Sequence, residues 1–177
     1  MPEDVSRIER LIRCIPDFPQ PGVLFRDITP LLGSASGFKA ALAAMVAQVP
    51  DGIDVVAGIE SRGFIFGMPL AMALGVGFVP VRKPGKLPGP VYEESFDLEY
   101  GSSTLAIHTD AFRPGQRVLV VDDLLASGGT LLAAAALVRR AQADPVHLSV
   151  LIELTGLGGR EQLAEQGLTA LSSVLAY

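Results

Sequence analysis

One stretch of the sequence decides the fold: Val118-Leu119-Val120-Val121-Asp122-Asp123-Leu124-Leu125-Ala126-Ser127-Gly128-Gly129-Thr130. Its first four residues are valine and leucine, as in a strand that is buried on both faces of a parallel sheet. Two carboxylates and a turn of small residues follow, and helical spacing of apolar residues then runs from Thr130 to Ala143. A buried strand that leads through a turn into a helix predicts a parallel α/β fold.

The same alternation extends over the rest of the chain. Short apolar runs predict three more strands, at Val55–Ile59, Phe78–Val81 and His147–Ile152. Helical spacing predicts helices over about 4–15, 36–48 and 64–74, the first of them ended by the prolines between Pro16 and Gly22. Because the 177 residues show no repeat or linker, we expect one domain with a central, mainly parallel sheet flanked by helices.

Proline and glycine are frequent between Arg82 and Phe96. This composition favours neither helix nor strand, so we expect a long loop over 82–96, a mobile flap held between sheet strands. Beyond the loop, Thr104–His108 alternate like a strand, and Arg113–Gln116 are typical of a turn.

Composition excludes several classes of protein. The net charge of −5 leaves no basic face for nucleic acid. The longest apolar run, Leu131–Val138, is far shorter than the roughly 18 residues of a membrane span. Acidic residues at positions 3 and 4 replace the basic start of a secretory signal, so we expect a cytoplasmic protein that binds no membrane. The single cysteine, Cys14, fits on or beside the face of the first helix and has no zinc-ligand partners.

The turn Ser127-Gly128-Gly129-Thr130 has the features of an anion site. Its glycines let the backbone approach an anion closely, and its N–H groups and hydroxyls are donors. The helix that follows adds the positive potential of its N-terminus. Ligands in parallel sheets gather beyond the carboxyl ends of strands, which is where this turn should lie. The sequence therefore predicts a phosphate monoester at residues 126–130.

Asp122 and Asp123 would repel a phosphate, so they must face another part of the same ligand. A sugar 5-phosphate satisfies both sites, because its ring hydroxyls can donate to the two carboxylates while its phosphate lies in the turn. Taken alone, an Asp-Asp pair is equally typical of a solvated strand end. The chain contains neither G-x-x-x-x-G-K-[ST] nor G-x-G-x-x-G, the motifs of other phosphate sites.

The quoted stretch resembles the phosphoribosyl-pyrophosphate motif of type I phosphoribosyltransferases. Further segments resemble, in order, those of the adenine phosphoribosyltransferases: Phe25–Leu32, Glu60–Phe64, Arg82–Gly89 and Leu98–Gly101. One residue departs from the pattern, since Ser127 stands where the family usually has threonine; the hydroxyl donor is kept and a methyl group is absent.

The resemblance implies a fold and a reaction. The fold would be that of type I phosphoribosyltransferases, a single domain over 1–177 with a small hood over about 1–35 and a flexible catalytic loop at 82–96. The reaction would be that of a pentosyltransferase in purine salvage: adenine and phosphoribosyl pyrophosphate give AMP and pyrophosphate. Mg²⁺ is the implied cofactor, held mainly by the diphosphate and water rather than by direct protein ligands.

The resemblance also implies residue roles. Sugar and 5-phosphate would be bound by Asp122, Asp123, Ala126, Ser127, Gly128, Gly129 and Thr130. Pyrophosphate would be bound by Arg62, Arg82, Lys83 and Lys86. Glu99 would exchange a proton with purine N7 as the catalytic acid and base. In relatives some residues of the basic loop serve the neighbouring subunit, which implies a homodimer.

The base would be selected at Leu24, Phe25 and Arg26, through backbone groups that read the adenine edge and a ring that stacks on it. A 6-oxopurine reverses the donor and acceptor there, and mismatched buried groups would stay unpaired. Two alternatives remain open: a transferase for hypoxanthine, guanine or xanthine, and a non-catalytic regulator that senses phosphoribosyl pyrophosphate. Regulators of that kind are expected to carry a DNA-binding module, and this acidic chain shows none.

Overall fold

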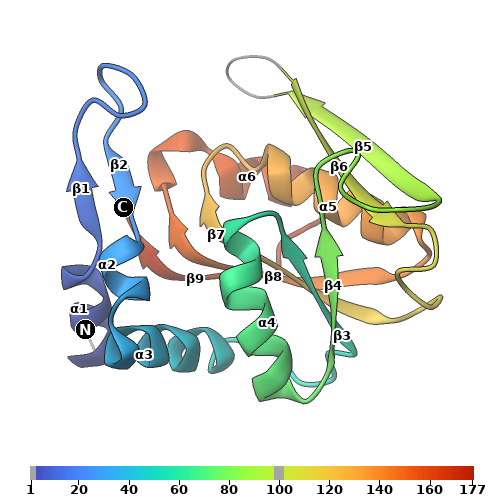
Figure 1. Cartoon of the computed structure of the whole chain (residues 1–177), viewed down its shortest axis with the longest axis horizontal. Coiled ribbons are helices and arrows are strands. Elements are labelled where there is room, and N and C mark those ends of the chain that lie inside the picture. Colours follow the sequence, from blue (N-terminus) through green and yellow to red (C-terminus); the bar gives the residue numbers. More distant parts are fainter. Residues whose placement is uncertain (1–2, 98–101) are drawn as a thin grey trace.

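The computed structural model describes residues 3–97 and 102–177 (Figure 1). The helices are α1 (Glu3–Arg10), α2 (Thr29–Leu32), α3 (Ala35–Val46), α4 (Arg62–Leu74), α5 (Gly129–Arg140), the 3-10 helix η1 (Thr155–Leu157) and α6 (Gly159–Glu165). The strands are β1 (Arg13–Ile15), β2 (Phe25–Asp27), β3 (Val55–Ile59), β4 (Gly77–Val81), β5 (Val91–Asp97), β6 (Ser102–His108), β7 (Arg117–Leu125), β8 (Asp144–Glu153) and β9 (Leu171–Ala176).

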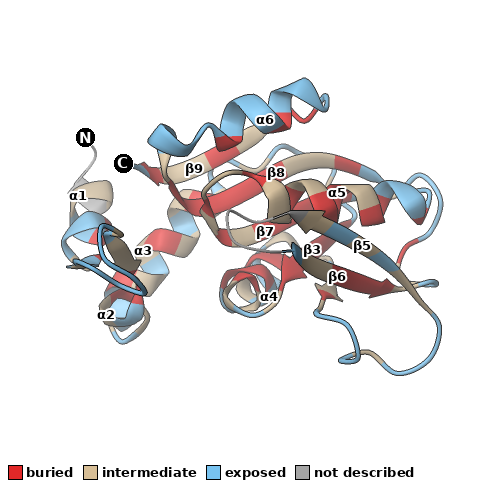
Figure 2. Cartoon of the chain, turned by 90° about the horizontal axis from the view of Figure 1, so that it is seen from above, coloured by how far each residue is buried: buried red, intermediate tan, exposed pale blue. Residues whose placement is uncertain are grey.

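The centre of the molecule is a five-stranded sheet in the order β4-β3-β7-β8-β9, with every neighbouring pair parallel. Helices cover both faces, α3 and α4 on one and α5 and α6 on the other (Figures 1 and 2). The predicted parallel α/β sheet flanked by helices is confirmed. Strands β3 and β7, which the apolar runs predicted most clearly, pair with each other in a register that places Val55 opposite Val118.

The strand order reverses between β3 and β7. From β3 the chain crosses through α4 to β4 on one side, whereas from β7 it crosses through α5 to β8 on the other. Because such crossovers are right-handed, the two helices must lie on opposite faces, and the connections leaving the carboxyl ends of β3 and β7 diverge. The divergence opens a crevice at that edge, the usual ligand position in open α/β sheets.

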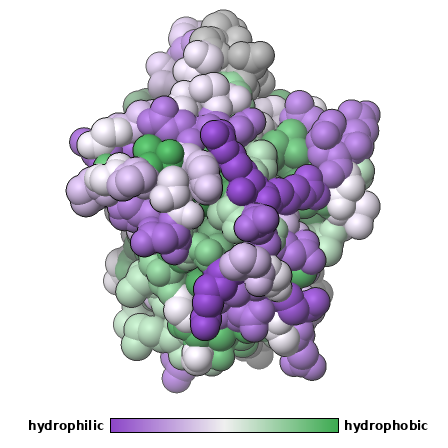
Figure 3. Space-filling model, turned by 90° about the vertical axis from the view of Figure 1, so that its right-hand side faces the viewer, coloured by the Kyte–Doolittle hydropathy of each residue, from purple (hydrophilic) through white to green (hydrophobic). Residues whose placement is uncertain are grey.

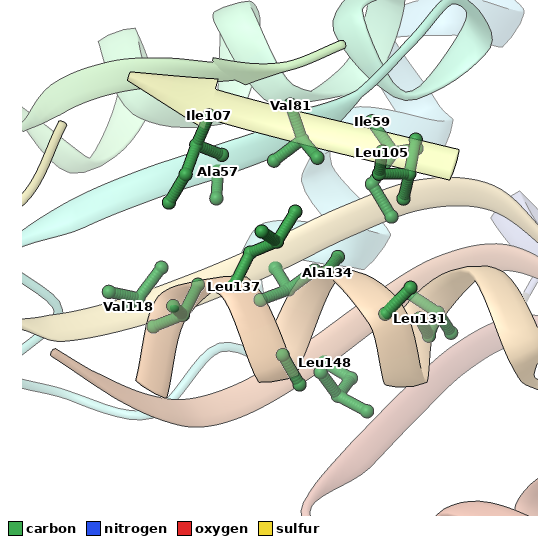
Figure 4. Close-up of a cluster of buried hydrophobic side chains, with 14 of the residues drawn as sticks. Ala57, Ile59, Val81, Leu105, Ile107, Val118, Leu131, Ala134, Leu137 and Leu148 are labelled. Atoms are coloured by element: carbon green, nitrogen blue, oxygen red, sulfur yellow. The ribbon is translucent and has the colours of Figure 1, made fainter. Parts of the chain in front are cut away.

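Two hydrophobic layers hold the sheet in place. In β7 the side chains of Val118 and Val120 pack on the α5 face, while Leu119 and Val121 pack on the face of α3 and α4. The continuous apolar run is thus explained by burial on both sides. Figure 4 shows the first layer, where side chains from β3, β4 and β6 point toward those of α5.

Two small antiparallel ribbons lie outside the main sheet. β1 pairs with β2, and these strands stand with α1 and α2 at one end of the sheet, which agrees with the hood expected over about 1–35 (Figure 1). β5 pairs with β6 from Val91–His108 to Asp97–Ser102, and β5 packs on α5. A bridge between Arg82 and Ala106 ties β6 to the end of β4.

The prediction of one helix over 4–15 was wrong at its end. α1 stops at Arg10, and Arg13–Ile15 form β1. Cys14 therefore lies in a strand, exposed, rather than beside a helix face, and the Nη1 of Arg26 lies 2.7 Å from its sulfur. The ion pair of Arg13 with Asp27 stabilises the strand pairing, a tertiary contact that helical spacing cannot reveal.

The prediction of a loop over 82–96 was also wrong in part. Only the proline- and glycine-rich residues from 83 to 90 lack regular structure beyond turns, and β5 begins at Val91. The pattern of β5, with Glu93, Glu94 and Ser95, is polar because this strand pairs only with β6 and lies outside the main sheet.

The surface is mixed in character. On the face drawn in Figure 3, hydrophilic side chains predominate toward the top, while hydrophobic side chains reach the surface in the lower half. Within residues 3–97 and 102–177, none of the helices has both the length and the hydrophobicity that crossing a membrane requires.

Candidate active site

The crevice at the strand-order reversal is built around the first turn of α4. β3 ends at Ile59, the Glu60–Ser61 peptide is cis, and Arg62 begins the helix. Gly63 packs directly on β7, where a Cβ would lie 2.6 Å from the Val121 carbonyl oxygen and 3.2 Å from Asp122 Oδ1. The absence of a side chain at Gly63 lets α4 start against β7 and places Arg62 beside the two aspartates.

Arg62 and Asp123 form an ion pair across this junction. The distance from Arg62 Nε to Asp123 Oδ2 is 2.9 Å; the carboxylate side chain is 7% exposed and the guanidinium side chain 41%. One side of the guanidinium is therefore fixed by a buried carboxylate, while the rest remains accessible to a ligand. Its Cζ lies 5.9 Å from the centre of the Phe25 ring, so this arginine connects the strand end to the hood.

The two aspartates lie inside β7, not after it. The prediction ended the strand at Val121, but β7 continues to Leu125 and pairs with β8 as far as Glu153. Both Asp122 and Asp123 line the same cavity beside Arg62. Asp122 Oδ1 accepts a hydrogen bond from the Asp123 N–H at 2.9 Å.

The turn that follows encloses a cavity of about 180 Å³. Its lining consists of Arg62 and the continuous segment 122–131, so it includes every residue predicted to bind the sugar and its 5-phosphate. Gly128 adopts a φ of 97° at the N-cap of α5, a conformation that glycine tolerates and other residues rarely adopt. The first turn of a twelve-residue helix thus opens onto the cavity, as the anion-site prediction required.

Both aspartates have raised pKa values. Burial is the main cause for each, since it removes water from the charged form; the charge of Asp123 raises the pKa of Asp122 further. The Arg62 guanidinium opposes this rise at Asp123. The carboxyl pair is thus costly to keep charged until sugar hydroxyls or other donors satisfy it.

Replacing Asp122 by asparagine is expected to stabilise the fold while weakening sugar binding. In the wild type the folded chain keeps a proton that the unfolded chain releases at its pKa of 3.8, so the free energy of unfolding falls as pH rises from 3.8 through the raised folded pKa. Asparagine keeps the acceptor Oδ1 and carries no charge. We expect Asp122→Asn to add about 1 kcal/mol to the free energy of unfolding at pH 7 and nothing at pH 3.

Urea unfolding at the two pH values measures this difference. Asp110→Asn is the matched control, because Asp110 is exposed and its replacement should change stability little at either pH. An Asp122→Asn protein that is less stable than the wild type at pH 7 would contradict a costly charge on this half-buried carboxylate.

The basic cluster predicted to bind pyrophosphate does not line the cavity. Arg82 pairs with Glu60 through Nε at 3.2 Å and donates to the Lys86 carbonyl oxygen at 3.0 Å. Glu60 also accepts the Lys83 N–H at 2.9 Å, and this hydrogen bond is the main cause of its lowered pKa. Arg82 thus clamps the start of the loop to the turn that carries Arg62, while the side chains of Lys83 and Lys86 are exposed.

The three predicted base-binding residues, Phe25 and Arg26 in β2 and Leu24 directly before it, divide between two sites. Phe25 faces Arg62 and is packed edge-on by Phe18, with ring centres 5.1 Å apart. Leu24 and Arg26 line a separate cavity of about 410 Å³, where Arg26 stacks on the Tyr177 ring at 3.9 Å. Glu99, predicted as the catalytic acid and base, lies outside the described residues.

Two contributors were not predicted. Gly63 was part of a recognised segment, but its close approach to β7 depends on a tertiary contact. Gly159, at the start of α6, packs on Ala126, and the sequence after Ile152 had predicted no element at all. The position of Gly63 beside Arg62 is a sequence signal that could have predicted its role. No local sequence signal marks Gly159.

The histidines make structural contacts, as expected. His108 Nε2 lies 2.8 Å from the Pro88 carbonyl oxygen, and His147 Nε2 lies 3.0 Å from Ser172 Oγ. No group of three or more His, Cys, Asp or Glu side chains suited to a metal ion occurs in the described part of the chain.

Comparisons with known proteins agree with this geometry. The phosphoribosyl transferase domain model matches residues 28–165. The chain is 56% identical to the adenine phosphoribosyltransferase of Cutibacterium acnes over 168 residues, 95% of each chain. Among solved structures, the adenine phosphoribosyltransferase of Thermoanaerobacter pseudethanolicus has a TM-score of 0.91 at 47% identity, covering 98% of this chain and 99% of that one.

A third similar protein was solved with a ligand. The Giardia lamblia enzyme complexed with 9-deazaadenine has a TM-score of 0.92 at 42% identity, covering 98% of this chain and 97% of that one. The family match covers most of the chain, and the identities extend over nearly its full length. The chain belongs to the adenine phosphoribosyltransferases of the phosphoribosyl transferase domain family.

Proposed function

We propose that this protein forms AMP and pyrophosphate from adenine and phosphoribosyl pyrophosphate at the crevice between the ends of β3 and β7. The observation that carries the proposal is the cavity lined by Arg62 and residues 122–131, which joins an anion-binding turn to two carboxylates and a partly accessible guanidinium. Each of these features suits one part of a phosphoribosyl diphosphate.

The ligand would lie along the cavity in a fixed order. Its 5-phosphate would accept hydrogen bonds from the turn 126–130 and face the N-terminus of α5. Its ring hydroxyls would donate to Asp122 and Asp123, which supplies donors to the half-buried and the buried carboxylate. Its diphosphate would then point toward Arg62, whose planar guanidinium can bind two oxygens at once.

Arg82, Lys83 and Lys86 are proposed to add positive charge to the diphosphate. In this structure Arg82 is paired with Glu60, and the two lysines are exposed, so the loop from 83 to 90 would have to approach the ligand. Loops that close over a substrate exclude water and strengthen the electrostatic contacts inside the site.

Base recognition is proposed at the unpaired edge of β2. Among the described strands β2 pairs only with β1. Pro16 has no N–H, which favours Phe25 as the residue whose backbone bonds to Ile15; Leu24 and Arg26 then present their N–H and C=O groups to the opposite edge. One donor and one acceptor on that edge would match adenine, and the bound 9-deazaadenine of the Giardia enzyme supports a purine-like ligand for such a site.

The chemistry is a displacement at C1 of the ribose. The bond from adenine N9 to C1 forms while the bond from C1 to the pyrophosphate oxygen breaks, and the electron pair leaves with pyrophosphate. Arg62 would stabilise the charge that develops on the leaving oxygens, and the carboxylates would stabilise the positive sugar. Glu99 would exchange the proton at N7 as N9 bonds to the sugar.

Mg²⁺ is proposed to enter with the diphosphate. The described residues hold no cluster of three protein ligands, and Asp123 is already paired with Arg62. This donor set suits a Mg²⁺ ion that keeps substrate oxygens and water as its ligands, with at most an aspartate nearby. When bound, the ion neutralises diphosphate charge; the binding and orientation of the sugar are left to the protein.

A homodimer is proposed through the outer face of α4. Ile65, Met68 and Met72 recur at helical spacing and are exposed, Met72 by 79%. These side chains form an apolar surface of a kind that an exposed helix seldom carries. Because this surface begins one turn after Arg62, a second copy bound to it would lie near the site. Met72→Lys should convert a dimer to monomers in sedimentation equilibrium; an unchanged mass would remove this interface.

The function is tested by supplying Mg²⁺, phosphoribosyl pyrophosphate and one purine at a time. We expect AMP from adenine and little product from hypoxanthine, guanine or xanthine, because a 6-oxopurine leaves buried groups unpaired. IMP or GMP without AMP would assign the chain to a different purine. Binding of phosphoribosyl pyrophosphate without any product would favour the sensing regulator.

A further inference from the structure

Helix α6 begins directly against the turn 126–130. A Cβ on Gly159 would overlap the Ala126 carbonyl oxygen and lie 3.1 Å from the Ala126 carbonyl carbon and 2.7 Å from Leu125 Cδ1. The closest approach, to the Ala126 carbonyl oxygen, involves backbone, so rotation of the Leu125 side chain alone could not relieve the overlap. The start of α6 and the cavity wall are thus in backbone contact.

The contact between α6 and the turn also includes Gly128. A Cβ on Gly128 would lie 3.0 Å from the Gly159 carbonyl oxygen and 3.3 Å from Gln162 Oε1. Gly128 also holds the positive φ that caps α5. Two glycines from distant parts of the chain therefore face each other, one on α6 and one on the anion-binding turn.

An ion pair between the exposed Arg160 and the buried Glu153 fixes α6 in this position. Glu153, 5% exposed at the end of β8, accepts hydrogen bonds from Arg160 Nε at 2.8 Å, Arg160 Nη2 at 2.5 Å and Ser173 Oγ at 2.9 Å. Arg160 also donates to the Leu171 carbonyl oxygen at 3.2 Å. A bidentate arginine pair of this kind fixes orientation as well as distance.

The same strand end is joined to β7. The Leu154 N–H donates to the Leu125 carbonyl oxygen at 2.9 Å, and Glu153 pairs with Leu125 in the sheet. The residue before the turn and the anchor of α6 therefore share one junction, and the Ala126 carbonyl occupies the space that Gly159 leaves open.

We propose that Gly159, held by the Glu153–Arg160 pair, is a positioning residue that sets the place of the turn 126–130 and thereby its affinity for the 5-phosphate. The inference rests on the proposed function, in which this turn binds that phosphate. A side chain at position 159 pushes the Ala126 carbonyl toward the cavity. A displacement of about 1 Å at a binding loop can cost about 10²-fold in kcat/KM.

Gly159→Ala tests the proposal, with Gly156→Ala as the matched control. Gly156 lies three residues earlier, and a Cβ there meets nothing within 4 Å. We expect Gly159→Ala to raise KM for phosphoribosyl pyrophosphate and Kd for ribose 5-phosphate by roughly tenfold or more, with KM for adenine unchanged. Gly156→Ala should leave all three constants unchanged.

Binding of ribose 5-phosphate, measured by calorimetry, distinguishes a failure of the proposed function from a failure of the role of Gly159. A wild-type protein that does not bind it would overturn the proposed function. A wild-type protein that binds it beside a Gly159→Ala variant of equal affinity would overturn the role of Gly159 alone, as would an equal rise in both KM values, which indicates a general loss of structure.

Arg160→Lys keeps the proposal testable if Gly159→Ala does not fold. Lysine retains the charge beside Glu153 but cannot make the two-pronged contact, so α6 is held less firmly. We expect a several-fold higher Kd for ribose 5-phosphate with KM for adenine unchanged. Unchanged affinity for ribose 5-phosphate in this variant would contradict the proposal.

Discussion

Arg62→Ala is expected to lower kcat/KM for phosphoribosyl pyrophosphate by roughly 10³-fold, the loss typical of removing one charge-stabilising group from a closed site. Arg62 is the one basic side chain among the residues that line the described cavity, and this side chain is 41% exposed. Arg82, Lys83 and Lys86 do not line this cavity, and Arg82 is paired with Glu60. Steady-state kinetics with varied phosphoribosyl pyrophosphate measures the loss.

Two companion variants separate catalysis from stability. Removing Arg62 leaves the buried Asp123 carboxylate without its partner, which should lower the free energy of unfolding by about 1–3 kcal/mol. Arg62→Ala combined with Asp123→Asn should recover much of that stability and none of the activity. Arg62→Lys, which keeps the charge without the planar fork, should fall between wild type and alanine. Activity within a few-fold of wild type in Arg62→Ala would remove the pyrophosphate role.

Glu99→Gln is the second change with a large expected effect. The resemblance to the family assigns Glu99 the proton exchange at purine N7, and glutamine is a similar shape without a titratable proton. We expect kcat to fall by roughly 10²-fold or more while the fold is retained. The pH dependence of kcat should also lose the limb that reports this carboxyl group.

Glu93→Gln is the matched control for this variant. Glu93 belongs to β5 of the β5–β6 hairpin, is exposed, and precedes Glu99 by six residues in the sequence. Its replacement should leave kcat unchanged, so a comparable loss in both variants would indicate a disturbed hairpin. Near-wild-type turnover in Glu99→Gln would assign the proton exchange to another group.

The sheet could be predicted because its central strands are buried on both faces. Val55–Ile59 and Val118–Val121 are continuous apolar runs, and runs of this kind have few structural alternatives. The prediction failed at short or partly polar strands: β1 and β5 lie outside the main sheet, and β9, an edge strand of the main sheet, was not predicted. Arg13–Ile15 fit helical spacing and yet form β1, and Glu93, Glu94 and Ser95 interrupt the apolar residues of β5, which pairs with β6 outside the main sheet.

The candidate site was predictable in its local part only. Residues 122–130 are continuous in sequence, so their residue types already described an anion site and a carboxyl pair. The ion pair of Arg62 with Asp123 and the contact of Gly159 with Ala126 join segments that are distant in the chain. Only the fold brings them together, and no spacing rule reveals them.

The central claim is that the cavity at Arg62 and residues 122–131 holds the ribose 5-phosphate, and a crystal structure with AMP tests it most directly. The account predicts that the phosphate contacts the backbone of the turn 126–130, that the ribose hydroxyls contact Asp122 and Asp123, and that the base lies against Phe25. A phosphate bound instead at Lys83 and Lys86, or in the cavity beside Tyr177, would contradict it.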